Sequence, residues 1–137
     1  MRLSIYLISL YKVSMENKNG VTLTPEGYVE EKWIGPQTRE SVELLTQESH
    51  GLARQLLARG QNALVLVDST DVESATSGAR SAAIKALSNS EFEKIAIVSR
   101  NNLWDLVIKV TLKITKRADR SKVFHDHEEA VQWLLGE

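Results

Sequence analysis

The sequence has no cysteine, and among its 137 residues it has only two prolines and seven glycines. The absence of cysteine excludes a disulfide framework, a thiolate metal site and a cysteine nucleophile. It is also typical of proteins in a reducing compartment, so we expect a cytoplasmic protein. The low content of proline and glycine gives no sign of disorder or of a fibrous repeat.

An excess of charge of either sign is also absent. The 17 basic and 18 acidic residues give a formal charge of −1, so the whole chain has no general attraction to nucleic acid or to an anionic membrane. A charged partner must therefore be met by a local patch. A chain of this length can bury about 68–70% of the surface of its extended form, so we expect a single domain over residues 1–137.

A long apolar run is lacking as well. The run LSIYLISLY near the start is too short to cross a bilayer as a helix and has no small-residue cleavage site. We expect residues 1–20 to form either a strand or a leader extension. If translation starts at Met15, residues 1–14 have no structural role.

The rest of the chain predicts alternating strands and helices. Pro25-Glu26-Gly27 is a turn signal for a hairpin between residues 21–23 and 28–34, and Gly35-Pro36 is expected to end its second strand. Thr38 can then cap a helix of about twenty residues that ends at Gly60.

The continuous apolar run at residues 63–67 predicts a strand that is covered on both faces, and Lys94 followed by the apolar residues 95–98 repeats this pattern. A helix is expected after each of these segments, over about residues 76–87 and from Ser99 or Asn101 onward. A short strand at 121–124 and a helix capped by Asp126 complete the chain. The order predicts an α/β fold with about four helices, in which an N-terminal antiparallel hairpin precedes parallel strands.

Three stretches share a pattern with a known family. They are Ile34-Gly35 leading into Thr38-Arg39-Glu40, the strand LVLVD ending at Asp68, and the final VFHDHEEAVQWL. These residues resemble the SpoIIAA-like branch of the STAS domains, also described as STAS/SEC14-like, whose ending F-x-x-x-x-E-A-x-x-W-L matches Phe124, Glu129, Ala130, Trp133 and Leu134. The resemblance implies a mixed sheet with helices mostly on one face.

The resemblance also implies a candidate phosphorylation site. In anti-sigma-factor antagonists of this fold, a turn after the equivalent strand carries Asp-Ser-Ser-Gly, and phosphorylation of its first Ser switches partner binding. Alignment on Gly78 gives Thr76 as the phosphoacceptor, counting from Asp68 gives Ser77, and Ala75 replaces the acidic residue. The alternative is that these hydroxyls only cap the following helix.

Asp68, Asp71 and Gly78 form a candidate turn for binding a partner or ligand, because α/β folds place ligands at the carboxyl ends of parallel strands. The alternative is that Asp68 only stabilises its own turn. The stretch has neither a P-loop nor a dinucleotide-binding glycine pattern.

The segment His125-Asp126-His127 offers two imidazoles and one carboxylate, but a structural zinc site normally takes four ligands. We therefore predict no metal and no cofactor. His50 has no recognisable triad partner, so the sequence gives no support for hydrolase chemistry and we predict that the protein is not an enzyme. Clustering of Asp68, His125 and His127 around one cleft would indicate the opposite.

Positive charge is concentrated at the end of the third predicted helix and just beyond it, and the candidate surface residues there are Lys109, Lys113, Lys116, Arg117 and Arg120. With its many apolar neighbours, this helix suits either an anionic membrane or the cover of an apolar cavity. The alternative is an ordinary solvated face that complements the helix dipole. Nucleic-acid binding is not expected, since only Trp104 lies near enough in sequence to stack on a base.

Two hypotheses of function follow. In the first, a non-enzymatic STAS-like module binds a regulatory protein through residues 68–78 and the next helix, with Thr76 or Ser77 as a phospho-switch. In the second, which the SEC14-like resemblance implies, the long helices enclose a lipid or another hydrophobic small molecule, with peripheral membrane contact. The sequence leaves a homodimer open in both.

Overall fold

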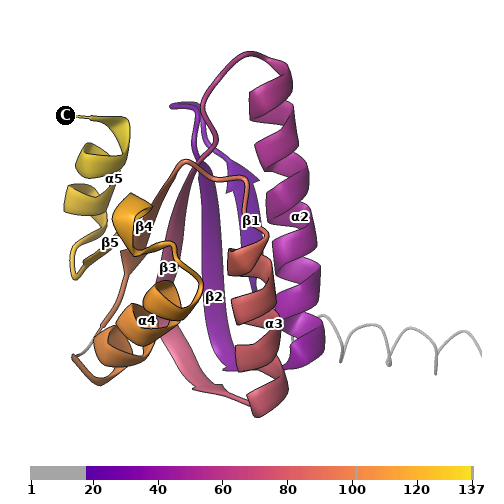
Figure 1. Cartoon of the computed structure of the whole chain (residues 1–137), viewed down its shortest axis with the longest axis vertical. Coiled ribbons are helices and arrows are strands. Elements are labelled where there is room, and N and C mark those ends of the chain that lie inside the picture. Colours follow the sequence, from indigo (N-terminus) through magenta and orange to yellow (C-terminus); the bar gives the residue numbers. More distant parts are fainter. Residues whose placement is uncertain (1–17, 101, 137) are drawn as a thin grey trace, which may run out of the picture.

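The computed structural model describes residues 18–100 and 102–136. In this part of the chain, a five-stranded sheet with the order β1-β2-β3-β4-β5 is accompanied by four α-helices and one short 3-10 helix (Figure 1). Most of the strand or leader expected over residues 1–20 lies outside the described residues. No helix among the described residues is long and apolar enough to cross a membrane.

The elements follow the predicted order. They are β1 (Gly20–Leu23), β2 (Val29–Gln37), α2 (Arg39–Ala58), β3 (Leu64–Ala75), α3 (Ser77–Ser88), β4 (Lys94–Val98), α4 (Asn102–Ile114), η1 (Ala118–Arg120), β5 (Ser121–Phe124) and α5 (His127–Leu135). β1 pairs with β2 in the antiparallel direction, and the other neighbouring strands are parallel. The predicted mixed sheet is therefore confirmed.

The prediction that Gly35-Pro36 ends the second strand is wrong. β2 continues to Gln37, and Pro36 lies opposite Ser74 of β3. Gly35 has a φ of 74°, and the register shifts between Gly35 and Pro36. This irregularity admits a proline, which cannot donate a backbone hydrogen bond, without ending the pairing.

The prediction that the third strand ends at Asp68 is also wrong, because β3 runs on through Asp71 to Ala75. The extended β2 supplies the pairing, with Ile34 opposite Asp71 and Gln37 opposite Ala75. The stretch read as a turn is therefore mostly strand, followed directly by the start of α3.

Successive side chains of the strands point alternately into two cores, one on each face of the sheet. On one face, Val65 and Ile95 pack with Leu56 of α2 and Leu112 of α4. On the opposite face α5 covers the sheet, and the buried residues there are Tyr28, Leu66, Ala96, Val98, Ala130 and Leu134. The predicted closing motif is part of this second core, where Trp133 is half-buried and its ring centroid lies 5.7 Å from that of Phe124.

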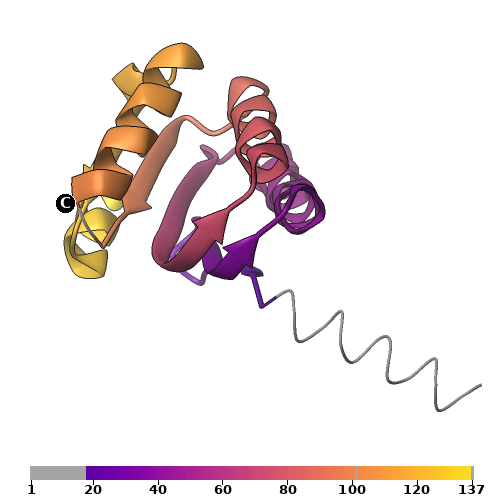
Figure 2. The ribbon, with the colours of Figure 1, turned by 90° about the horizontal axis from the view of Figure 1, so that it is seen from below.

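The helices on the first face are unevenly spaced. Val42 of α2 packs with Ala79 and Ala82 of α3. Figure 2 shows α2 and α3 side by side, with α4 apart from them. Small side chains bring α3 close to α2 and leave room between α3 and α4.

Candidate functional site

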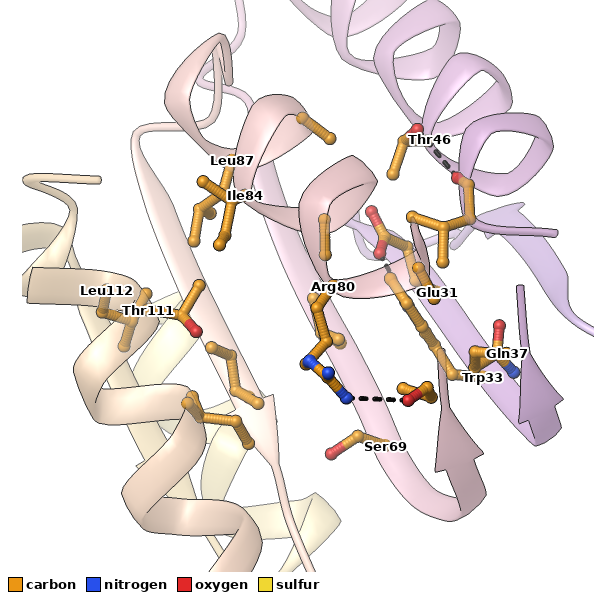
Figure 3. A pocket seen from close by; sticks show the side chains of 18 of the residues that line it. Glu31, Trp33, Gln37, Thr46, Ser69, Arg80, Ile84, Leu87, Thr111 and Leu112 are labelled. Atoms are coloured by element: carbon orange, nitrogen blue, oxygen red, sulfur yellow. Dashed lines mark hydrogen bonds between the residues drawn. The ribbon is translucent and has the colours of Figure 1, made fainter. Parts of the chain in front are cut away.

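A cavity of about 720 Å³ lies over the sheet between α3 and α4 and extends past α3 to side chains of α2 and β2 (Figure 3). Its floor is apolar and consists of Val65 and Val67 of β3 together with Ile95 and Ile97 of β4. Sites for small ligands have volumes of about 300–1,000 Å³ and mostly apolar linings. The size and lining of this cavity are therefore those of a ligand site.

The cavity exists because α3 is rich in alanine. Ala79, Ala83 and Ala86 line it from α3, and their methyl groups cannot reach across to α4. Figure 3 shows the larger Ile84 and Leu87 of α3 on the side that faces α4. The three alanines therefore leave free volume on their side of α3, whereas Ile84 and Leu87 narrow the cavity toward α4.

The outer wall of the cavity is the apolar side of α4. Val107, Val110 and Ile114 line the cavity, yet they are 39%, 49% and 63% exposed, respectively. Leu112 also lines the cavity, but it is buried in the first core and holds the helix on the sheet. The cavity is thus open to solvent along an apolar rim.

Glu31 supplies a buried carboxyl group to this apolar site. It lies on β2 between Val29 and Trp33 on the inward face and is only 6% exposed. Its Oε1 accepts a hydrogen bond from Trp33 Nε1 at 3.0 Å, and its Oε2 accepts one from the hydroxyl of Ser49 at 2.5 Å. Burial raises the pKa of the Glu31 carboxyl, while these two hydrogen bonds act in the opposite direction.

His50 of α2 also lines the cavity and is half-buried, with its ring centroid 6.3 Å from that of Phe92. Burial lowers the pKa of His50, the positive charge of Arg54 lowers it further, and the negative charge of Glu91 opposes both. The cavity therefore favours the neutral imidazole. No nucleophile is hydrogen-bonded to it among the interactions that the described residues show.

Polar groups are found at the other end of the cavity, where β3 approaches the start of α3. Arg80 projects from α3 toward Ser69 of β3 (Figure 3). Its Nη1 donates to the carbonyl oxygen of Ala75 at 2.9 Å, and the Ser69 hydroxyl donates to the carbonyl oxygen of Val98 at 2.7 Å. Arg80 is exposed, so it places a positive charge at the cavity mouth.

Thr76 and Ser77, the candidate phosphoacceptors, lie at the start of α3. Thr76 is the N-cap, and its side-chain oxygen accepts a hydrogen bond from the Ala79 backbone N–H at 3.0 Å. Ser77 is exposed and lines the cavity. Capping accounts for Thr76 but not for Ser77, and the phosphoacceptor role of both residues stays a prediction.

The other residues of the candidate turn do not line the cavity. Asp68 Oδ1 accepts hydrogen bonds from the backbone N–H and the hydroxyl of Thr70 at 3.0 and 2.6 Å, and Asp71 is exposed. A Cβ added at Gly78 would lie 3.3 Å from Cβ of Arg39, so this glycine allows α3 to pass close to the start of α2.

The two C-terminal histidines have separate carboxylate partners. His125 Nε2 lies 2.6 Å from Asp105 Oδ2, and His127 pairs with Glu30. Among the described residues, no group of three or more histidine, aspartate or glutamate side chains is placed to hold a metal ion. Neither histidine lines the cavity, and neither does Asp68. The clustering of these three side chains around one cleft, which would indicate an enzyme, is therefore not observed at the cavity.

Asp105 is the buried member of its pair. Burial raises the pKa of the Asp105 carboxyl, but hydrogen bonds with His125 and Ser99, together with the charges of His125 and Lys109, outweigh this and lower it. The pair joins the first turn of α4 to the end of β5.

The predicted basic residues divide into two groups. Lys109, Lys113 and Lys116 are exposed, and Arg120 is half-exposed. Arg117 is instead directed at the end of α3, where its guanidinium group donates to the carbonyl oxygens of Leu87 and Ser88.

The sequence analysis offered an apolar cavity enclosed by the long helices as one hypothesis, but it missed three polar residues of the cavity, Glu31, Trp33 and Arg80. A signal for Glu31 was present, since the alternation in Val29-Glu30-Glu31-Lys32-Trp33 puts it on the same side as Val29 and Trp33. A carboxyl at an inward strand position is unusual enough to mark a site. Arg80 has no comparable signal.

The structure resembles a crystal structure of an uncharacterised protein of the DUF3478 family from Shewanella loihica PV-4, described as having a SpoIIAA-like fold. The TM-score is 0.64 at 21% sequence identity, over 85% of this chain and 91% of that chain. The fold is therefore SpoIIAA-like, as the sequence resemblance implied. The chain belongs to the DUF7793 family, described as a domain of unknown function, whose model matches residues 37–136. No curated protein matches it in sequence.

Proposed function

We propose that this protein is a non-enzymatic binding module that holds a hydrophobic small molecule in the cavity between α3 and α4. The observation that carries the proposal is the cavity itself, which has a volume of about 720 Å³ and an apolar floor. Burial of apolar ligand surface contributes about 25 cal/mol per Å². A ligand that covers this floor therefore gains most of its affinity without any specific charge pair.

Glu31 gives the site its selectivity. A buried carboxyl with a raised pKa disfavours a ligand that brings a second negative charge to it, and it accepts a hydroxyl or amide hydrogen readily. The ligand then lies with a neutral polar group toward Glu31 and with its apolar body between Ile84 and Ile97.

Binding of the neutral solvatochromic dye Nile red tests this proposal. We expect saturable binding of one dye per chain, and we expect Ala83→Phe to abolish it, because the new ring enters the cavity from α3. Ala58→Phe, on the exposed end of α2, is the matched control and should bind normally. Ala86→Phe provides a second filled cavity if the first variant unfolds.

The natural ligand is sought by weighing protein purified from its own cells, first by native mass spectrometry and then after denaturation. Added mass that is lost on denaturation supports the proposal. Equal dye binding by the filled variants and the control would contradict it, and so would failure of the unaltered protein to bind the dye.

A further inference from the structure

The two helices that border the cavity mouth carry exposed positive charge and no exposed negative charge among their described side chains. α3 contains Arg80 and Lys85 and no acidic residue. On α4, Lys109 and Lys113 are exposed, whereas the acidic Asp105 is buried against His125. Since the formal charge of the whole chain is only −1, this face is positive against a nearly neutral background.

The other helices differ from α3 and α4 in this respect. α2 has the exposed acidic residues Glu40, Glu43 and Glu48, and the first turn of α5 has Glu128 and Glu129. Exposed positive charge without exposed negative charge is therefore a property of α3 and α4, and not of α2, which covers the same side of the sheet.

The same face presents an exposed apolar stripe. Val107, Val110 and Ile114 recur at a spacing of three and four residues, so they lie along one side of α4. Lys109 and Lys113 are four residues apart and form a neighbouring stripe, with Lys113 one turn beyond Val110. An apolar stripe bordered by lysines is the pattern of a helix that lies in the plane of a membrane interface.

We propose that this face docks on the surface of a lipid bilayer that contains anionic lipids. The docking face is defined by Val107, Val110, Ile114, Lys85, Lys109 and Lys113. Val107, Val110 and Ile114 enter the boundary between head groups and acyl chains. The lysine stems lie along this boundary, with their ammonium groups at the anionic lipid phosphates.

A bilayer fits these observations because it satisfies both the apolar stripe of α4 and the positive charge of α3 and α4. Stable peripheral binding takes two signals, and here the stripe and the lysines supply them. In this orientation the cavity mouth between α3 and α4 opens toward the acyl chains. Val107, Val110 and Ile114 also line the cavity, so within the docking face only the lysines lie outside the site proposed above.

Flotation with lipid vesicles tests the inference. We expect the protein to float with vesicles of phosphatidylcholine and phosphatidylglycerol, to bind weakly to phosphatidylcholine alone, and to be released by added salt. The double variant Lys109→Glu/Lys113→Glu should lose at least about tenfold in vesicle affinity, since each lysine near an anionic surface contributes measurably to binding. Arg54→Glu/Arg59→Glu, with the same charge change on exposed positions at the end of α2, should bind as the unaltered protein does.

A second pair of variants tests the contribution of the apolar stripe of α4. Ile114→Gln should lower vesicle affinity by at least about fivefold, because a large apolar side chain no longer enters the interface. Leu44→Gln, at a 50% exposed position on α2, should have no effect. Each variant is compared in its folded state by circular dichroism.

Failure of the unaltered protein to float with anionic vesicles would overturn the inference, as would equal losses in the test and control variants. Capture of a soluble anionic amphiphile without vesicle binding would also overturn it. The two proposals fail separately: Ala83→Phe should lose Nile red binding and keep vesicle binding, whereas the lysine variant should show the reverse.

Discussion

The guanidinium group of Arg117 is held against the carbonyl oxygen of Leu87, to which its Nε donates a hydrogen bond at 3.0 Å. Its Nη2 donates a second one, at 2.9 Å, to the carbonyl oxygen of Ser88. Both carbonyls belong to the last turn of α3, where helical acceptors have no partner within the helix. Because Arg117 follows α4, this contact fixes the spacing of α3 and α4 at one end of the cavity.

Arg117→Ala is therefore expected to lower the free energy of unfolding by about 1–3 kcal/mol, because two backbone carbonyls lose a charged donor. Arg117→Lys should recover only part of this loss, since an ammonium group cannot copy the planar fork of donors. Urea unfolding of both variants, with Arg120→Ala as the control, measures the effect. Equal stabilities of Arg117→Ala and Arg120→Ala would show that the contact contributes nothing.

Glu31 should make stability depend on pH. Because the pKa of Glu31 is raised in the folded protein, the folded state keeps a proton that the unfolded state loses above the ordinary value of about 4.3. The free energy of unfolding then falls as pH rises from that value to the folded-state pKa, by up to about 1.4 kcal/mol per pH unit.

Glu31→Gln removes this titration, so its stability relative to the unaltered protein should increase between about pH 4 and about pH 8. Urea unfolding at both pH values gives the comparison, and Glu43→Gln controls for the loss of an exposed carboxyl. A difference between Glu31→Gln and the unaltered protein that is the same at both pH values would contradict the prediction.

Asp105 should make the free energy of unfolding depend on pH in the direction opposite to Glu31. Its pKa is lowered in the folded protein, so its contribution to stability is present above the ordinary value of about 3.9 and is lost as pH falls through the folded-state pKa. His125→Ala should cost about 1–3 kcal/mol near neutral pH, because the buried carboxylate loses a partner.

In strong acid the stabilities of His125→Ala and the unaltered protein should converge. Thermal unfolding across this pH range, with His127→Ala alongside, provides the measurement. A loss that persists unchanged in acid would point to packing of the His125 ring instead of its interaction with Asp105.

Substitutions at the start of α3 can distinguish a helix-capping role from a phosphorylation role. Thr76→Ala should cost about 0.5–2 kcal/mol, since Thr76 caps the helix, whereas Ser77→Ala should change stability little. Intact mass after denaturation reports on modification at either residue. If Thr76 or Ser77 is a phospho-switch, an acidic replacement there must also change the capture of a protein partner. Unchanged capture would leave these residues with a structural role only.

The sequence predicted those parts of the fold that depend on local chemistry. Thr38, Thr76 and Asp126 cap their helices, each by accepting a backbone hydrogen bond from a residue two or three positions ahead. The strand at residues 94–98 was predicted with its observed bounds, because the apolar residues 95–98 suit a strand that is covered on both faces.

The parts of the structure that the sequence did not predict depend on contacts between segments that are distant in the chain. Asp68 and Asp71 have low strand propensity, and they remain in β3 because the end of β2 lies alongside to pair with them. The cavity depends on the distance between α3 and α4, which no local pattern encodes. Glu31 was visible in the alternation of its strand, but its role becomes clear only once Ser49 of α2 is placed above it.

The alanines of α3 also bear on how this site can diverge among related chains. Ala79 packs against Val42 of α2, whereas Ala83 and Ala86 are only partly buried and line the cavity, so a larger residue at Ala83 or Ala86 shortens the cavity without disturbing the sheet. These two positions therefore limit the size of the ligand that the site accommodates. Ligand size can evolve there independently of the fold.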